Sequence, residues 1–294
     1  MIVEPRANPS STYADGLARA RAIQALDDDR VLPAARTLLL EHGEVRPWSV
    51  VLLHGLTNNP AQFARFAPLV HARGANVFAP RLVDHGYRDR LTPALASITA
   101  EQMLASAYDA VDLACGLGER VAVLGISLGG LQSAYLAQFR DDVATSVPIA
   151  PDFALLQLPY GVSKALGGVM RALPNMFLWW DPRIREEQRP LTAYPRFPTR
   201  ALMQTLRIAD AIYTAAKREP ARAGRIAMVV NRADPAVNNE VTMEVVTEWR
   251  GLRRDGIEAV ELRSLPENHD IIDPDNPLAR TDLVYPKLLE TLAI

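Results

Sequence analysis

The sequence predicts an α/β protein in which a mostly parallel central sheet carries helices on both faces. From Arg36 onward, short apolar runs rich in β-branched residues alternate with longer segments that have helical spacing. The chain of 294 residues is 49% hydrophobic and 22% charged, which is enough apolar material for a large core. A proline-broken stretch at about 151–200 interrupts the alternation and predicts an inserted cap.

Seven apolar runs are expected to form strands. They are Thr37–Glu41, Ser49–Leu53, Asn76–Ala79, Arg120–Gly125, Ala144–Ile149, Arg225–Asn231 and Glu258–Ser264. The loop H-G-E-V-R-P-W between the first two runs is short enough for a hairpin. We therefore expect the sheet to open with an antiparallel pair made by these two strands.

Four segments between the strands have the spacing of amphipathic helices. Phe63, Phe66, Leu69 and Val70, for example, recur at intervals of three and four. The predicted helices are Ala61–Ala72, Thr99–Leu113, Val241–Leu252 and Pro277–Leu292. The second begins with a Thr followed three residues later by Gln, which fits a capping box.

The chain is expected to be one α/β domain over residues 36–294, with the cap insertion at about 151–200. Residues 1–35, with D-D-D-R at 27–30, are interpreted as a poorly constrained lead-in that is helical or irregular. The cap segment combines prolines with large apolar side chains. We see no internal repeat or flexible linker, so the length is assigned to this cap and not to a second core.

Composition excludes several classes of protein. Lys and Arg number 32 against 34 Asp and Glu, so nothing points to nucleic acid as a partner. The single cysteine, Cys115, rules out an intramolecular disulfide and a cysteine-rich metal site, and no cofactor is expected. Lys164 and Arg171 interrupt the most apolar region, so no transmembrane segment is predicted. The first residues lack the apolar core of a secretory signal, which favours a cytoplasmic location.

The pattern G-x-S-x-G at Gly125, Ser127 and Gly129 is the sharpest chemical feature. A predicted strand ends at Gly125 and a helical run follows Ser127, so the serine is placed on a tight strand-to-helix turn. Glycines are expected on both sides because a Cβ there would collide with the neighbouring strand and helix. The helix amino terminus favours developing negative charge. Ser127 is therefore the candidate nucleophile.

A serine nucleophile needs a base to take its proton and an acid to orient that base. His269 is the one histidine in a loop after the last predicted strand. Asp234 directly follows the strand Arg225–Asn231, at a strand's carboxyl end. Asp270 and Asp273 compete for the acid role, but Asp270 adjoins His269 and is awkwardly placed to orient it. We therefore favour Asp234.

Two backbone N–H groups are needed to hold the negative oxygen of a tetrahedral intermediate. Leu128, which follows the nucleophile, is one candidate. Leu56 is the other, because Gly55 lets the loop after the strand Ser49–Leu53 turn toward the site. His54 in that loop is interpreted as a structural hydrogen-bonding residue.

The chain resembles an α/β-hydrolase-fold serine hydrolase of the bacterial carboxylesterase, monoacylglycerol lipase and lysophospholipase-like branch. The resemblance runs from about Thr37 to Leu292. It rests on H-G-L-T at 54–57, A-P-R-L-V-D-H-G at 79–86, G-I-S-L-G-G at 125–130, D-P at 234–235 and N-H-D at 268–270. It implies Ser127 as nucleophile, Asp234 as triad acid and His269 as triad base, with Leu56 and Leu128 as oxyanion-hole donors. A supporting loop that usually reads G-H-G has Asp84 before His85 and Gly86 here.

The predicted activity is hydrolysis of carboxylic esters through an acyl-serine intermediate. The cap is rich in large apolar side chains, and we expect Phe153, Tyr160, Phe177, Trp179 and Trp180 to contact a small-molecule acyl ester. No basic cluster adjoins the site in the sequence, so anionic substrates such as acyl-CoA are less expected than neutral ones.

Other readings remain open at the level of sequence. The same residues serve amide, thioester or carbon–carbon bond hydrolysis, and an inactive relative could keep the pocket as a ligand-binding protein. A metal enzyme built on His54, His85 and Asp84 is disfavoured, because no H-x-x-x-H or comparable spacing is present.

Overall fold

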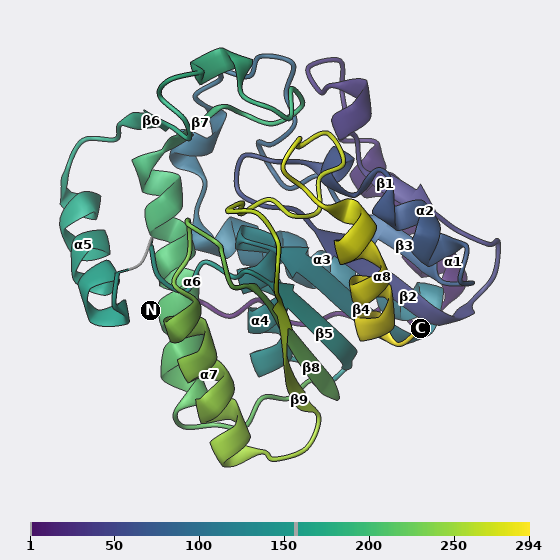
Figure 1. The fold of residues 1–294 in the computed structure, drawn as a ribbon. Helices are drawn as coiled ribbons and strands as arrows, with labels where there is room; N and C mark the ends of the chain where they lie inside the picture. Colours follow the sequence, from purple (N-terminus) through teal and green to yellow (C-terminus); the bar gives the residue numbers. More distant parts are fainter. Residues whose placement is uncertain (1, 156–157) are drawn as a thin grey trace.

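A seven-stranded sheet in the order β1-β3-β2-β4-β5-β8-β9 forms the centre of the protein in the computed structural model, which describes residues 2–155 and 158–294 (Figure 1). All neighbouring strands are parallel except β1 and β3. The strands are β1 (Leu38–Leu40), β2 (Arg46–Leu53), β3 (Asn76–Ala79), β4 (Gly118–Ile126), β5 (Val143–Ile149), β8 (Arg225–Asn231) and β9 (Ile257–Leu262). Each of the seven predicted strands is confirmed: Asn76–Ala79 and Arg225–Asn231 have the predicted bounds, and the ends of the other five shift by at most three residues.

The predicted hairpin between the first two strands is wrong, although the edge strand is antiparallel. Strand β1 pairs with β3, with Leu39 opposite Phe78. Strand β2 lies between β3 and β4, and both of these partners are parallel to it. The loop after β1 is held instead by buried Asn76, whose Oδ1 accepts from His42 N at 2.8 Å and whose Nδ2 donates to Glu44 O at 2.8 Å. With both edges of β2 occupied, only the outer edge of β3 remains for β1.

Successive residues of the central strands bury against opposite layers of helices, as a parallel sheet covered on both faces requires. Val51 and Leu53 of β2 belong to the core beneath α1, α3, α4, α6 and α7. Val50 and Leu52 belong to the core beneath α2 and α8. Figure 1 shows these two layers on either side of the sheet.

The helices are α1 (Tyr13–Gln24), α2 (Phe66–His71), α3 (Ala100–Leu117), α4 (Leu128–Phe139), α5 (Tyr160–Ala172), α6 (Thr199–Ala216), α7 (Asn239–Leu252) and α8 (Thr281–Leu292). The capping box of α3 is confirmed, with Thr99 Oγ1 accepting from Gln102 N at 3.2 Å and Gln102 Oε1 accepting from Thr99 N at 3.0 Å. Helix α6, in contrast, was not among the segments predicted from spacing.

The predicted helix Ala61–Ala72 is divided into a 3-10 turn, Pro60–Phe63, and the short helix α2. Proline has no backbone N–H to donate, so a continuous helix would lack the bond from Pro68 to the residue four positions earlier. A new helix begins at Phe66, so Pro68 lies within its first turn, where a backbone N–H has no acceptor in the helix.

The first 35 residues are better ordered than the sequence predicts. Helix α1 packs against α3 so closely that a Cβ added to Gly16 would lie 2.6 Å from Leu113 O. Ser10 N donates to Asp112 O at 2.8 Å and anchors the chain before the helix. The expectation of a poorly constrained lead-in is wrong because small residues, which have little apolar signal, allow this close packing.

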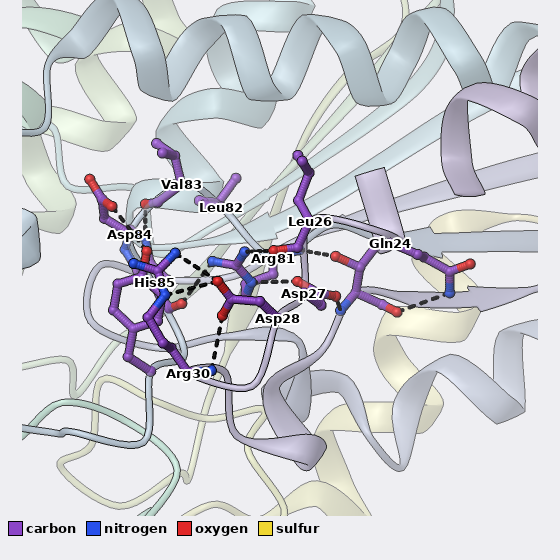
Figure 2. A network of polar contacts seen from close by, with 12 residues as sticks. Gln24, Leu26, Asp27, Asp28, Arg30, Arg81, Leu82, Val83, Asp84 and His85 are labelled. Atoms are coloured by element: carbon purple, nitrogen blue, oxygen red, sulfur yellow. Dashed lines mark hydrogen bonds and ion pairs between the residues drawn. The ribbon is translucent and has the colours of Figure 1, made fainter. Parts of the chain in front are cut away.

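The D-D-D-R run at 27–30 is anchored to the loop after β3 (Figure 2). Arg81 Nε donates to Asp27 Oδ1 at 2.6 Å, and the two side chains are only 9% and 3% exposed. Arg81 Nη1 also donates to His85 O at 3.0 Å. Asp27 Oδ2 accepts from Thr37 N at 2.6 Å. One buried ion pair therefore joins the amino-terminal segment to the H-G loop at 85–86.

The segment between β5 and α6 lies outside the main sheet. Helix α5 packs on α6, and β6 (Phe177–Trp179) and β7 (Arg196–Pro198) form a separate antiparallel ribbon (Figure 1). No helix among the described residues is both long and apolar enough to cross a membrane.

We predict that Asp27→Ala lowers the free energy of unfolding by about 3 kcal/mol, because it leaves the buried Arg81 guanidinium without its ionic partner. Urea unfolding followed by circular dichroism measures the change. Asp29→Ala removes an exposed carboxylate from the same run and should change the free energy little. Equal stability of the two variants would contradict the role assigned to the ion pair.

Candidate active site

Ser127 sits on a sharp turn between β4 and α4, with a φ of 58°. A φ in this range is strained for a residue with a Cβ, and such strain is characteristic of functional positions. A Cβ added to Gly125 would lie 2.1 Å from Gly129 O, and one added to Gly129 would lie 1.9 Å from Leu53 O. The collisions expected from the sequence are therefore present on both sides of the serine.

Asp234 and His269 are joined by a hydrogen bond between loops that follow β8 and β9. His269 Nδ1 lies 2.7 Å from Asp234 Oδ2. The other carboxylate oxygen of Asp234 accepts from Ala236 N at 2.8 Å, and the Asp234 side chain is fully buried. This pairing fixes Nδ1 as the donor and leaves Nε2 of His269 to act as a base.

Asn231 connects these two loops and was not identified from the sequence. Its Nδ2 donates to Asn268 O at 2.8 Å, next to His269, and its Oδ1 accepts from Ala233 N at 3.1 Å, next to Asp234. Asn231 is fully buried at the end of β8. The sequence did contain a signal for Asn231: it is an amide at the end of an apolar strand, and a buried amide needs hydrogen-bond partners inside the protein.

The surroundings of His269 favour its protonated form. Burial alone would lower the pKa of His269, but the charge and hydrogen bond of Asp234 and the charges of Asp270 and Asp152 outweigh it, so the pKa is raised. Asp152, a second residue missed from the sequence, is buried behind the pair and accepts from Thr205 Oγ1 at 3.0 Å. Burial raises the pKa of Asp152 to about 6.

The loop after β2 places its backbone against the nucleophile. A Cβ added to Gly55 would lie 3.5 Å from Ser127 Cβ, and Gly55 N donates to Gln62 Oε1 at 3.0 Å. Leu56, the next residue, lines the same cavity as Ser127. Leu128 is the first residue of α4, where backbone N–H groups have no partner within the helix. The geometry thus brings both predicted donor residues to the serine.

His54 has a structural role, and the buried ring of His85 lies edge-on to it with the ring centroids 4.9 Å apart. His54 Nε2 accepts from Leu82 N at 3.1 Å, and Nδ1 donates to Gly55 O at 3.0 Å, which leaves neither nitrogen for a metal ion. Burial lowers the pKa of His54 well below its usual value and that of His85 to about 4. Asp84, in place of the usual glycine, adopts a left-handed φ of 63°, which aspartate tolerates better than most residues.

Ser127 and His269 open on one cavity of about 220 Å³. Its wall combines apolar side chains with amides and arginines, including Leu56, Ile126, Tyr194, Asn268, Arg90 and Arg189. Trp180 is the residue of the predicted substrate-binding set that lines it.

The other four residues of that set lie outside the cavity wall. Phe153 is 1% exposed within the core. The ring of Tyr160 stacks on Tyr213, and its hydroxyl donates to Asp210. Phe177 and Trp179 face the Arg196 guanidinium. The contact between these four residues and substrate stays a prediction without support from the cavity, because packing against the core, α6 and β7 occupies them.

Three hydrogen bonds tie the loop at 54–60 to the segment 180–194. Trp180 Nε1 donates to Thr57 Oγ1, Tyr194 N donates to Thr57 O, and Asn59 Nδ2 donates to Thr192 O, each at 2.9 Å. Thr57 itself has a φ of 71°. The loop that carries Leu56 therefore takes its shape partly from the segment that covers it.

Together these groups have the parts required for acyl transfer. A strained serine and an imidazole oriented by a buried carboxylate line one cavity together with Leu56, and the serine stands at the amino terminus of α4. Such a set can activate a hydroxyl and stabilise negative charge on the oxygen of an attacked carbonyl.

Known proteins resemble the chain in sequence and in fold. A relative described as a thermostable monoacylglycerol lipase of Bacillus sp. is 28% identical over 180 residues, which cover 60% of this chain and 67% of the relative. The structure of a monoacylglycerol lipase from Paleococcus ferrophilus superposes with a TM-score of 0.64 at 20% identity, covering 87% of this chain and 97% of that one. A soluble variant of monoglyceride lipase from Saccharomyces cerevisiae has the same TM-score at 12% identity, covering 87% and 90%.

A family model described as the alpha/beta hydrolase family matches residues 50–284, which include all the candidate catalytic residues. The matched span extends from within β2 into α8 and so takes in most of the sheet. On this evidence the chain belongs to the alpha/beta hydrolase family.

Proposed function

We propose that the protein is a serine carboxylesterase or lipase-like hydrolase that cleaves carboxylic esters through an acyl-serine intermediate. The observation that carries the proposal is the 2.7 Å hydrogen bond between Asp234 and His269 at a cavity shared with the strained Ser127. The likeness to a named monoacylglycerol lipase supports esters as the bond that is cleaved.

In the acylation step, Nε2 of His269 takes the Ser127 proton as Oγ attacks the ester carbonyl. The negative charge that forms on the carbonyl oxygen is held by the backbone N–H groups of Leu56 and Leu128. Asp234 stabilises the imidazolium that results. Collapse of the intermediate breaks the ester bond, and His269 gives its proton to the departing alcohol.

In the deacylation step, His269 again acts as the base and takes a proton from water. The hydroxide equivalent attacks the acyl-Ser127 carbonyl, and the same two N–H groups hold the second oxyanion. The proton then returns to Ser127 Oγ, and the carboxylic acid leaves. The site therefore completes its cycle with groups that the chain itself supplies.

The cavity favours esters of modest size. At about 220 Å³ it is smaller than the roughly 300–1,000 Å³ that is typical of drug-sized ligands. We propose that the segment at about 151–200 acts as the cap and that Trp180 packs against the substrate from this side. Contacts between substrate and Phe153, Tyr160, Phe177 or Trp179 would require the cap to move, because these four residues lie outside the cavity wall.

We predict that Ser127→Ala lowers kcat for p-nitrophenyl butyrate by about 10⁶-fold, because the nucleophile is lost while the binding groups remain. The variant should also fail to react with a fluorophosphonate probe that labels the wild type. Ser97→Ala changes an exposed serine and serves as the control. Undiminished activity in Ser127→Ala would refute the proposed nucleophile, and failure of the wild type to label would favour a ligand-binding protein.

We predict that kcat/KM rises with pH through an inflection above the usual histidine pKa of about 6.5, because the base must lose a proton that its acidic neighbours stabilise. A pH series on p-nitrophenyl butyrate locates the inflection. Asp152→Asn removes one of the negative charges that raise the pKa of His269, so the inflection should move to lower pH. A shift to higher pH would contradict this electrostatic account.

We predict that Trp180→Phe lowers kcat about fivefold, because it removes the indole donor to Thr57 while keeping an aromatic ring against the cavity. Trp179→Phe is the matched control, since Trp179 lies outside the cavity wall. Steady-state kinetics separate a positioning role of Trp180 from simple contact with substrate. A fall in kcat supports the role of Trp180 in positioning the Leu56 loop, whereas a rise in KM with unchanged kcat would show that Trp180 only contacts substrate.

A further inference from the structure

Two arginines, Arg90 and Arg189, line the cavity that Ser127 and His269 share. Arg90 holds the segment 180–194, which covers this cavity. The Arg90 guanidinium donates to four backbone carbonyls, those of Ala193 at 2.7 Å, Glu186 at 2.8 Å, Gln188 at 2.9 Å and Pro190 at 3.5 Å. These acceptors satisfy its hydrogen bonds but carry no net charge. The positive charge of Arg90 is therefore left at the cavity wall.

Arg189 brings a second positive charge to the same wall. Burial lowers the pKa of Arg90, the Glu186 carboxylate opposes this effect, and the neighbouring Arg189 charge lowers the pKa by less than Glu186 raises it. The two guanidinium groups are thus close enough to repel each other. The Arg189 side chain is exposed and lines the cavity, and within residues 2–155 and 158–294 no ion pair engages it.

One acidic residue, Asp270, shares the cavity wall with the two arginines. Its carboxylate oxygens accept from Asn58 Nδ2 at 3.0 Å and from Asp273 N at 3.2 Å, so these hydrogen bonds go to groups other than the arginines. Glu186 and its neighbour Glu187 are exposed and lie outside the cavity lining. The wall therefore carries two guanidinium groups against one carboxylate, although the whole chain has a net charge of −2.

We propose that Arg189 forms a subsite for an anionic group, a carboxylate or a phosphate, carried by the ester substrate. A guanidinium with free donors binds either oxyanion through paired charged hydrogen bonds. Arg90 contributes a second positive charge beside this subsite, and it holds the segment that carries Arg189. The inference rests on the proposed esterase function and reverses the expectation, drawn from the sequence, that anionic substrates are disfavoured. Arg90 and Arg189 are far apart in sequence, so no basic cluster was visible there.

The carboxylate arm of the test compares p-nitrophenyl hemiadipate with p-nitrophenyl hexanoate, the neutral ester of the same chain length. The measured quantity is the ratio of kcat/KM for the anionic ester to that for the neutral ester. We expect Arg189→Gln to lower this ratio about tenfold and Arg189→Lys to lower it less. The wild-type ratio should also fall as salt is added.

Arg185→Gln is the matched control, because Arg185 is an exposed arginine on the same segment outside the cavity lining. Its ratio should equal that of the wild type. The phosphate arm applies the same variants to 1-butanoylglycerol 3-phosphate and 1-butanoylglycerol. A loss of preference in Arg189→Gln in either arm supports the subsite and identifies the anion, and unchanged ratios in both arms overturn it.

A binding measurement separates failure of the subsite from failure of the proposed function. Titration calorimetry compares adipamate, which has one carboxylate and one amide in place of the ester, with neutral adipamide. Tighter binding of adipamate to the wild type that is lost in Arg189→Gln supports the subsite even if no ester is hydrolysed. Equal binding of the two ligands overturns the subsite for a carboxylate and leaves the phosphate to be decided by the second kinetic arm, whereas hydrolysis of neutral esters without an anionic preference leaves the esterase function in place.

Discussion

Helix α4 lies in direct backbone contact with the end of β4 and with β2, and the rest of the site depends on this close approach. Gly129 leaves no room for a side chain against Leu53 O, and Gly125 leaves none against Gly129 itself. The chain must therefore turn sharply between them, which holds Ser127 at a φ of 58°. The same turn brings the amino terminus of α4 beneath the serine and the loop of Leu56 beside it.

The parts of the site that surround Ser127 are supported by polar groups that the sheet alone does not provide. Asn231 holds the acid and base loops together, and Trp180 and Tyr194 shape the loop of Leu56. Arg90 holds the covering segment through hydrogen bonds from its guanidinium to the backbone carbonyls of that segment. Each contact joins segments that are distant in sequence, so the geometry of the site depends on the segment 180–194 as well as on the sheet.

The sequence was sufficient to predict the strands and the loops that carry Ser127, Asp234 and His269, because apolar runs and strand ends are local signals. Predictions from the sequence failed where the structure depends on contacts with residues elsewhere in the chain. Pairing of β1 followed from both edges of β2 being occupied. Order in the lead-in followed from the buried pair of Asp27 and Arg81. The fold alone brings Arg90 and Arg189 together on the cavity wall.

The proposed function depends on transfer of an ester's acyl group to Ser127 through a covalent bond. The experiment mixes the wild type with p-nitrophenyl butyrate, stops the reaction with acid within the first turnovers and analyses the peptides by mass spectrometry. We expect a butanoyl group on the peptide that contains Ser127 and none in the Ser127→Ala variant. Turnover of the ester with the butanoyl group on another residue, or with none on Ser127 while product accumulates in a burst, would contradict it.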